Sequence, residues 1–138
     1  MNECRTRVRS EAAQLPALAK FLQEFWCAAA LPPAQSLAFE IALEEIFMNV
    51  VTHGTAAGGQ GHVDVCLALA EGSLTLAVED EGPPFDPLML PAPDTHSRLE
   101  ERPVGGLGVY FVRQLMDAVS YARVGSRNQL RMTKHLTR

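Results

Sequence analysis

This chain of 138 residues contains few cysteines and no long apolar run. The three cysteines, Cys4, Cys27 and Cys66, are odd in number and form no Cys-x-x-Cys pair, so neither a disulfide framework nor a cysteine zinc site is predicted. Glu, Gln or Pro interrupts every apolar stretch well before the roughly 18 residues that a membrane span requires. The N-terminus also lacks the apolar stretch of a signal peptide. We therefore expect a protein of the reducing cytoplasm that does not cross a membrane.

Excess positive charge is also lacking. Lys and Arg total 12 against 16 Asp and Glu, and the net charge of -4 argues against a nucleic-acid partner, because binding to a phosphate backbone depends on a basic footprint. The basic residues Arg131, Lys134 and Arg138 are spaced like the solvated outer face of a strand. Four isolated histidines lack the spacing of metal ligands and predict no zinc cage: His53, His62, His96 and His135.

The chain does contain enough apolar sequence, 47% of residues, to build one compact domain over residues 1–138. Its periodicity predicts a strand at 5–10, helices at 11–29 and 33–53, a strand hairpin at 62–70 and 73–79, a helix at 107–116, and strands at 118–124 and 129–136. The Pro-rich stretch 83–106 has little periodicity and is expected to form a lid. This order predicts an α+β fold, a two-layer sandwich with helices on one face of a mixed, mostly antiparallel sheet.

The helix expected at 33–53 carries two polar stripes. At about 100° per residue, Glu40 and Glu44 fall on one side, whereas Glu45 and Asn49 fall roughly 100° to 140° away. The first stripe is expected to face solvent. The second combines a carboxylate and an amide one turn apart beside the small residue Ala42, which has the shape of a site. An ordinary amphipathic helix with a polar pair remains the alternative.

Asp80 follows an apolar strand and is followed by Gly82. A carboxylate at the end of a buried strand can accept hydrogen bonds from an exocyclic amine, and the glycine lets a flat base approach the backbone. This arrangement suits adenine. The alternative is a Pro-rich turn in which Asp80 bonds only its own backbone.

A glycine cluster opens the helix expected at 107–116. Gly105, Gly106 and Gly108 would leave backbone N–H groups unobstructed at the positive end of the helix dipole, which is suited to phosphate oxygens. A dinucleotide fold is rejected, because there the cluster follows the first strand of a βαβ unit, and here it follows a long Pro-rich segment. A helix cap without a ligand is the remaining alternative.

Together, these motifs resemble the histidine kinase-like ATP-binding (GHKL) fold shared by gyrase, histidine kinases and mismatch-repair ATPases. They are Glu-x-x-x-Asn at 45–49, continuing as Val-Val-Thr-His-Gly, Asp-x-Gly-x-x-Phe-Asp at 80–86, and Gly-Gly-Leu-Gly at 105–108, with Arg-Gln-Leu-Met-Asp behind it. The chain is most similar to the short branch of this superfamily, the anti-sigma factor serine/threonine kinases of bacterial partner-switching systems. The resemblance covers nearly the whole chain.

The resemblance implies that ATP and Mg²⁺ are the cofactors. It implies that Asn49 coordinates Mg²⁺ between the phosphates and that Glu45 is the base toward the acceptor hydroxyl. Asp80 would accept from the adenine amine and Gly82 would allow the base to stack closely. His53 matches the histidine that follows the Asn in the family, and is expected to support the site rather than to carry phosphate.

The same resemblance implies roles for five further positions. The backbone at Gly105, Gly106 and Gly108 would enclose the phosphates when the lid closes, and Arg102 would be a charge partner. Thr133 on the last strand would make a water-mediated contact with adenine.

The family implies protein partners rather than small-molecule substrates. The expected substrate is a Ser or Thr on an anti-sigma factor antagonist, the expected sequestered target is a sigma factor or another regulator, and a homodimer is compatible with the family. The alternative is a non-catalytic, nucleotide-dependent module that only sequesters a regulator. Glu45 argues against that alternative, because a pure binder needs no base.

Overall fold

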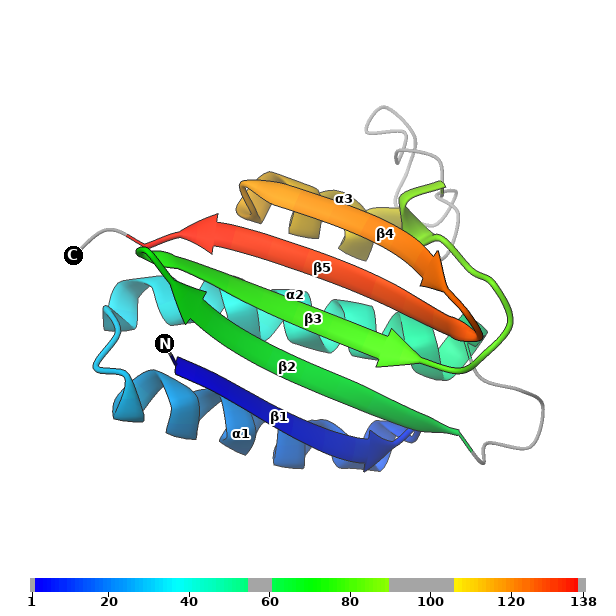
Figure 1. The fold of residues 1–138 in the computed structure, drawn as a ribbon, viewed down its shortest axis with the longest axis horizontal. Helices are drawn as coiled ribbons and strands as arrows, with labels where there is room; N and C mark the ends of the chain where they lie inside the picture. Colours follow the sequence, from blue (N-terminus) through cyan, green and yellow to red (C-terminus); the bar gives the residue numbers. More distant parts are fainter. Residues whose placement is uncertain (1, 55–60, 90–105, 137–138) are drawn as a thin grey trace.

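The computed structural model describes residues 2–54, 61–89 and 106–136. Its strands form one sheet in the order β1-β2-β3-β5-β4 (Figure 1), with the bounds β1 Asn2–Arg9, β2 His62–Ala70, β3 Ser73–Asp80, β4 Ala118–Val124 and β5 Arg127–His135. Every neighbouring pair is antiparallel. The α+β prediction is confirmed, and the sheet, which was expected to be mixed and mostly antiparallel, is antiparallel throughout its described strands.

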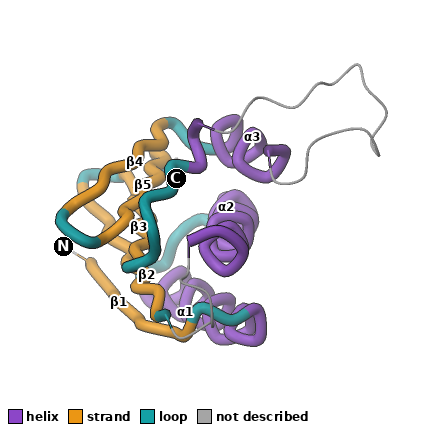
Figure 2. The backbone as a smooth tube through the Cα atoms, turned by 90° about the vertical axis from the view of Figure 1, so that its right-hand side faces the viewer, coloured by secondary structure: helices purple, strands orange, loops and turns teal. Residues whose placement is uncertain are grey.

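The α-helices of the described residues cover one face of this sheet. They are α1 Leu15–Ala28, α2 Ser36–Asn49 and α3 Gly106–Leu115. They form a single layer in which α2 lies between α1 and α3 (Figure 2). Within the described ranges, no helix is long and apolar enough to span a bilayer.

Proline and a left-handed residue set the limits of α1. Pro16 lies in the first turn, where a missing backbone N–H removes no helical hydrogen bond. Ala30, just beyond the last turn, has a φ of 52° and directs the chain away from the helix before Pro32, as the sequence predicts.

The end of α2 differs from the expectation. The sequence predicts an α-helix that reaches His53 and is capped by Gly54, but the α-helix ends at Asn49 and the segment Val50–Gly54 forms a π-helical turn. A π-turn closes its hydrogen bonds over five residues instead of four, so it widens the chain at this point. The widened turn follows directly after Asn49.

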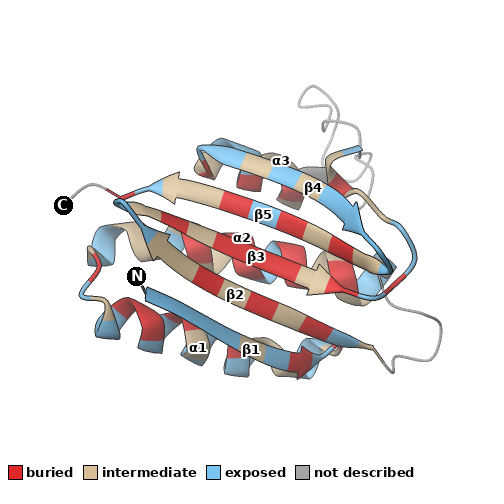
Figure 3. Ribbon diagram, in the orientation of Figure 1, coloured by how far each residue is buried: buried red, intermediate tan, exposed pale blue. Residues whose placement is uncertain are grey.

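The core lies between the sheet and the helices, where one face of each central strand is buried (Figure 3). Val63, Val65 and Leu67 on β2 have no exposed surface, and the alternating positions on β3 continue the same layer. Burying one such side chain contributes roughly 1.5–3 kcal/mol. The helices cover these strands with fully buried side chains, which include Leu18, Leu22, Phe39, Ile46 and Phe47.

The hairpin between β2 and β3 turns at the two residues predicted from the sequence. Glu71 and Gly72 have φ values of 53° and 80°. Two consecutive positive φ angles match the right-handed twist of a tight hairpin, and glycine adopts such an angle without strain. The turn fixes the register in which Val63 lies opposite Asp80.

Candidate active site

Glu45 lies on the side of α2 that faces α3. A Cβ atom added to Gly108 would lie 2.0 Å from Glu45 Oε2, so the carboxylate packs directly against the backbone at the start of α3. Only glycine permits this approach. Glu45 remains exposed to solvent in this position. The fold therefore brings together two predicted site residues that are far apart in the sequence.

A small cavity lies between the end of α2 and the end of β3. Asn49 reaches it from α2 and Asp80 reaches it from β3. The cavity measures about 20 Å³, which is room for about one water molecule. The other residues that line it are Ile46, Val50, Val78, Phe85, Pro87, Tyr121, Asn128 and Leu130.

Asp80 is only 3% exposed at this end of the sheet. Its Oδ2 accepts hydrogen bonds from the Gly82 N–H at 2.8 Å and from Asn128 Nδ2 at 3.2 Å. Burial raises the pKa of Asp80, and the bonds from Gly82 and Asn128 offset only part of that rise. The carboxylate is thus oriented by two donors in a poorly solvated position.

Asn128 is a central member of the site that sequence reasoning missed. Its Nδ2 donates to Asp80 and, at 2.9 Å, to the Pro83 carbonyl. Its Oδ1 accepts from the Tyr121 hydroxyl and from the Phe85 N–H, the latter at 3.3 Å. The sequence held a signal, because Asn128 shares the inward parity of Leu130 and Met132 on one strand, and a polar residue at such a position needs partners.

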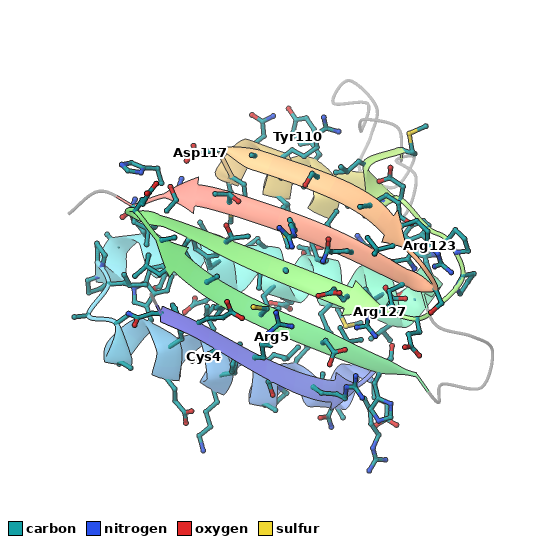
Figure 4. The ribbon with its side chains drawn as sticks, viewed as in Figure 1. Cys4, Arg5, Tyr110, Asp117, Arg123 and Arg127 are labelled. Carbon is teal, nitrogen blue, oxygen red and sulfur yellow. The ribbon has the colours of Figure 1, made fainter. Side chains whose placement is uncertain are left out.

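Arg123 fixes the loop that follows Asp80. Its Nη1 donates to the Gly82 carbonyl at 2.8 Å and to Asn128 Oδ1 at 3.3 Å. Figure 4 shows Arg123 at the end of the sheet where β3 finishes. The backbone around Gly82 is therefore held from both sides, by Asp80 and by Arg123.

Asn49 has a polar atom that lacks a partner. Its Nδ2 is buried, and no described residue forms a hydrogen bond with it. Leaving a buried donor unpaired costs about 1–3 kcal/mol. An amide side chain also offers an oxygen to hard cations such as Mg²⁺. Both properties suit a residue that contacts a ligand.

The residues around Asn49 form no protein cage for a metal. The described part of the chain contains no group of three or more His, Cys, Asp or Glu residues that could hold an ion. Any Mg²⁺ at Asn49 would therefore be held mainly by phosphate and water oxygens, which is usual for this ion.

His53 lies in the π-helical turn and contacts the site indirectly. Its ring lies 5.0 Å from that of Phe85, at an interplanar angle of 36°. Phe85 in turn lines the cavity beside Asp80. The supporting role expected for His53 stays a prediction.

The remaining predicted residues divide into two groups. Gly106 is the first residue of α3, whereas Arg102, Gly105 and most of the expected lid at 83–106 lie outside the described residues.

Thr133 is not brought to the site. It lies on the opposite face of the sheet from Asp80, and its Oγ1 is 3.0 Å from Thr75 Oγ1. Side chains alternate between the two faces of a strand, so Thr133 cannot face the Asp80 cavity. The adenine contact expected for Thr133 is therefore wrong.

A family model for the histidine kinase-like ATPase domain matches residues 8–134. The chain belongs to this family. Membership in a histidine kinase-like ATPase family implies ATP binding, and it confirms the family that the three motifs predict.

Two curated relatives of this histidine kinase-like ATPase domain carry protein kinase names. The serine/threonine-protein kinase BtrW of Bordetella bronchiseptica is 29% identical over 95 residues, which cover 69% of this chain and 67% of BtrW. The serine-protein kinase RsbW of Bacillus licheniformis is 33% identical over 104 residues, which cover 72% of this chain and 64% of RsbW. The match therefore spans about two thirds of the length of these relatives.

Two solved structures share the fold. The RsbU and RsbW domains of Rv1364c from Mycobacterium tuberculosis align with a TM-score of 0.73 and 16% identity, over 100% of this chain and 33% of theirs. A histidine kinase domain from Erythrobacter litoralis EL346 aligns with a TM-score of 0.55 and 19% identity, over 94% of this chain and 62% of its own. At such identities the likeness establishes the architecture alone.

Proposed function

We propose that this histidine kinase-like ATPase domain is a protein kinase that transfers the γ-phosphoryl group of ATP to a Ser or Thr of an anti-sigma factor antagonist. The observation that carries the proposal is the position of Glu45. Its carboxylate lies against the start of α3 and one helical turn from Asn49. The names of BtrW and RsbW support the same activity.

Asp80 is the residue that would recognise the base. Its buried carboxylate, held by Gly82 and Asn128, can accept a hydrogen bond from the exocyclic amine of adenine. A cavity of about 20 Å³ does not admit a purine, so a base that reaches Asp80 must displace part of the cavity wall, to which Phe85 belongs. Phe85 belongs to the loop after β3, so it is the residue that we expect to move.

Asn49 and the start of α3 would hold the phosphate end of the nucleotide. Bound Mg²⁺-ATP supplies the phosphoryl group and neutralises its charge. The unpaired amide of Asn49 is available to such a ligand. The first N–H groups of α3 have no helical partner, and Glu45 packs against this helix at Gly108.

Glu45 would act on the acceptor. It takes the proton from the Ser or Thr hydroxyl while that oxygen forms a bond to the γ-phosphorus. The bond between the γ-phosphorus and the bridging oxygen breaks at the same time, and ADP leaves with the electron pair. Phosphoryl transfer depends mainly on positioning and charge neutralisation, so one well-placed carboxylate is sufficient as the base.

The experiment is incubation of the chain with γ-labelled ATP and the antagonist encoded nearby, followed by identification of the labelled residue. Glu45→Gln should keep nucleotide affinity within about tenfold and lower transfer by roughly 10²-fold or more, the usual range for general-base catalysis. Glu24→Gln is the matched control, because Glu24 is an exposed carboxylate on α1. It should transfer at the wild-type rate.

The alternative is a module that sequesters a regulator without transferring phosphate. Two results would establish it in place of the kinase. One is tight binding of both ATP and antagonist by the wild-type chain with no label transferred. The other is equal transfer by Glu45→Gln and Glu24→Gln.

A further inference from the structure

A groove runs between α1 and α2, on the side of α2 that faces away from α3. Its volume is about 360 Å³, which falls within the roughly 300–1,000 Å³ of typical ligand sites. Leu15, Leu18 and Leu22 from α1 and Leu43 from α2 line it, but Leu18, Leu22 and Leu43 are almost fully buried and form its floor, and only Leu15 is partly exposed. Ala19 lies among them and is exposed, so the groove is open where this small side chain faces it.

Two carboxylates border this apolar surface. Glu40 and Glu44 line the groove from α2. The sequence predicts that this stripe simply faces solvent, but Glu40 is half-buried beside the groove and only Glu44 is well exposed. Leu37, one turn before Glu40 on the same side of the helix, is 60% exposed and extends the apolar surface along α2.

The charge on this border is not compensated within the described part of the chain. Neither Glu40 nor Glu44 forms an ion pair there, and Lys20 on α1 pairs instead with Glu24 at 3.8 Å. Like charges four residues apart destabilise a helix. The chain thus keeps a repulsive pair of carboxylates beside an open apolar groove, which an external cation would relieve.

We infer that this groove, bordered by Glu40 and Glu44, is a docking site for a basic amphipathic segment of a protein partner. Apolar side chains of that segment contact Ala19 and Leu15 above the buried floor of the groove, and its Lys or Arg residues pair with the two glutamates. Helices that place an apolar face in a groove of this kind are a common mode of peptide recognition. The sign of the groove's charge selects a basic segment over an acidic one.

The docking groove is separate from the candidate active site. Glu40 and Glu44 face α1, whereas Glu45 packs against α3 on the other side of the same helix. A segment bound in the groove therefore leaves the Asp80 cavity uncovered. The inference does not depend on kinase activity, and it can be tested without nucleotide.

The test uses the full chain and two synthetic helical peptides. Both carry leucines along one face, and one has lysines where the other has glutamates. Calorimetry measures affinity, and NMR of leucine methyl groups locates the bound peptide. We expect the lysine peptide to bind and to shift the methyl resonances of Leu15, Leu18 and Leu43, and we expect Mg²⁺-ATP to leave its affinity unchanged within twofold.

Matched variants identify the groove. Ala19→Arg should abolish binding because it fills the opening and pairs with the glutamates, whereas Ala17→Arg, an exposed position on α1 outside the groove, should not. The double variant Glu40→Gln/Glu44→Gln should bind roughly two- to thirtyfold more weakly, and Glu24→Gln should bind normally. Thermal unfolding should show the double variant to be at least as stable as wild type, because it removes a repulsion.

The inference is overturned by any of four results. The first two are that the glutamate peptide binds as tightly as the lysine peptide, and that Ala17→Arg loses binding of the lysine peptide. The other two are that the methyl shifts are confined to the Asp80 cavity or to the sheet face without helices, and that the peptide competes with Mg²⁺-ATP.

Discussion

Gly108→Ala is the substitution whose effect follows most directly from the geometry of the site. The added Cβ would lie 2.0 Å from Glu45 Oε2. To restore an ordinary contact of about 3.5 Å, the carboxylate must move by roughly 1.5 Å. The atom that moves is the end of a flexible, exposed side chain, so the fold can accommodate the change. Since Ala also favours a helix over Gly by roughly 0.5–1 kcal/mol, we expect the variant to be as stable as wild type.

Phosphoryl transfer should respond very differently from stability. A displacement of about 1 Å can cost a reaction about 10²-fold, and we expect a loss of that order in transfer to the antagonist. The assay is label transfer from γ-labelled ATP, with calorimetry for ATP affinity and thermal unfolding for stability. A variant that transfers at the wild-type rate would refute the assignment of Glu45 as the base.

A double-mutant cycle separates Glu45 from the backbone of α3. If the loss in Gly108→Ala arises through the displaced carboxylate, the same substitution in a Glu45→Gln background should have little further effect, because the two changes are then strongly coupled. An equal further loss in that background would show that the methyl group obstructs the nucleotide itself. The cycle would then assign Gly108 to phosphate binding and leave Glu45 unsupported.

Further predictions concern three residues that line the Asp80 cavity. Asn49→Ala should bind Mg²⁺-ATP more weakly than the wild-type chain. Calorimetry of the wild-type chain with a chelator should show the same loss of ATP affinity. Equal wild-type affinity with and without chelator would contradict a role for Asn49 in metal binding. Asp80→Asn should reduce the preference for ATP over GTP. Because the fold raises the pKa of Asp80, the wild-type chain loses stability as pH rises from the unfolded-state pKa through the raised folded-state pKa, and Asp80→Asn does not. The unfolding free energy of Asp80→Asn relative to wild type should therefore increase from pH 3 to pH 7, and a flat difference would contradict the buried carboxylate. Asn128→Ala should lower the unfolding free energy by about 2–4 kcal/mol in denaturant titrations, because it leaves buried hydrogen-bonding partners unpaired. A loss no larger than that of an Asn→Ala change at an exposed position would contradict the hydrogen bonds assigned to Asn128.

The local pattern of apolar and polar residues is sufficient to predict most of the fold. The alternation along 62–70 and 73–79, and the turn at Glu71 and Gly72, predicted the central hairpin as it is observed. Parity could also have excluded Thr133, since it alternates with Leu130 and Met132 and so faces the other side of the sheet. The expectation for Thr133 came from the family resemblance and not from the strand.

The rest of the site depends on pairing between distant segments, which periodicity does not encode. Asn128 meets Asp80 only because β5 pairs with β3 in a register that places the two residues opposite each other. Likewise, the contact between Glu45 and Gly108 depends on how closely two helices pack on the sheet. A sequence shows that a polar residue points inward, but its partner is decided by tertiary structure.

Glu44 and Glu45 illustrate how one helix can serve two surfaces. They are neighbours in sequence, and the 100° between successive residues directs one toward α1 and the other toward α3. Because α2 lies between the other two helices, each direction leads to a different environment: an apolar groove on one side, and a glycine backbone on the other (Figure 2). Charge changes at Glu44 and Glu45 should therefore act on different partners, the first on a docked protein segment and the second on the acceptor hydroxyl. Substituting both residues at once would merge the two effects, so the single variants are the informative ones.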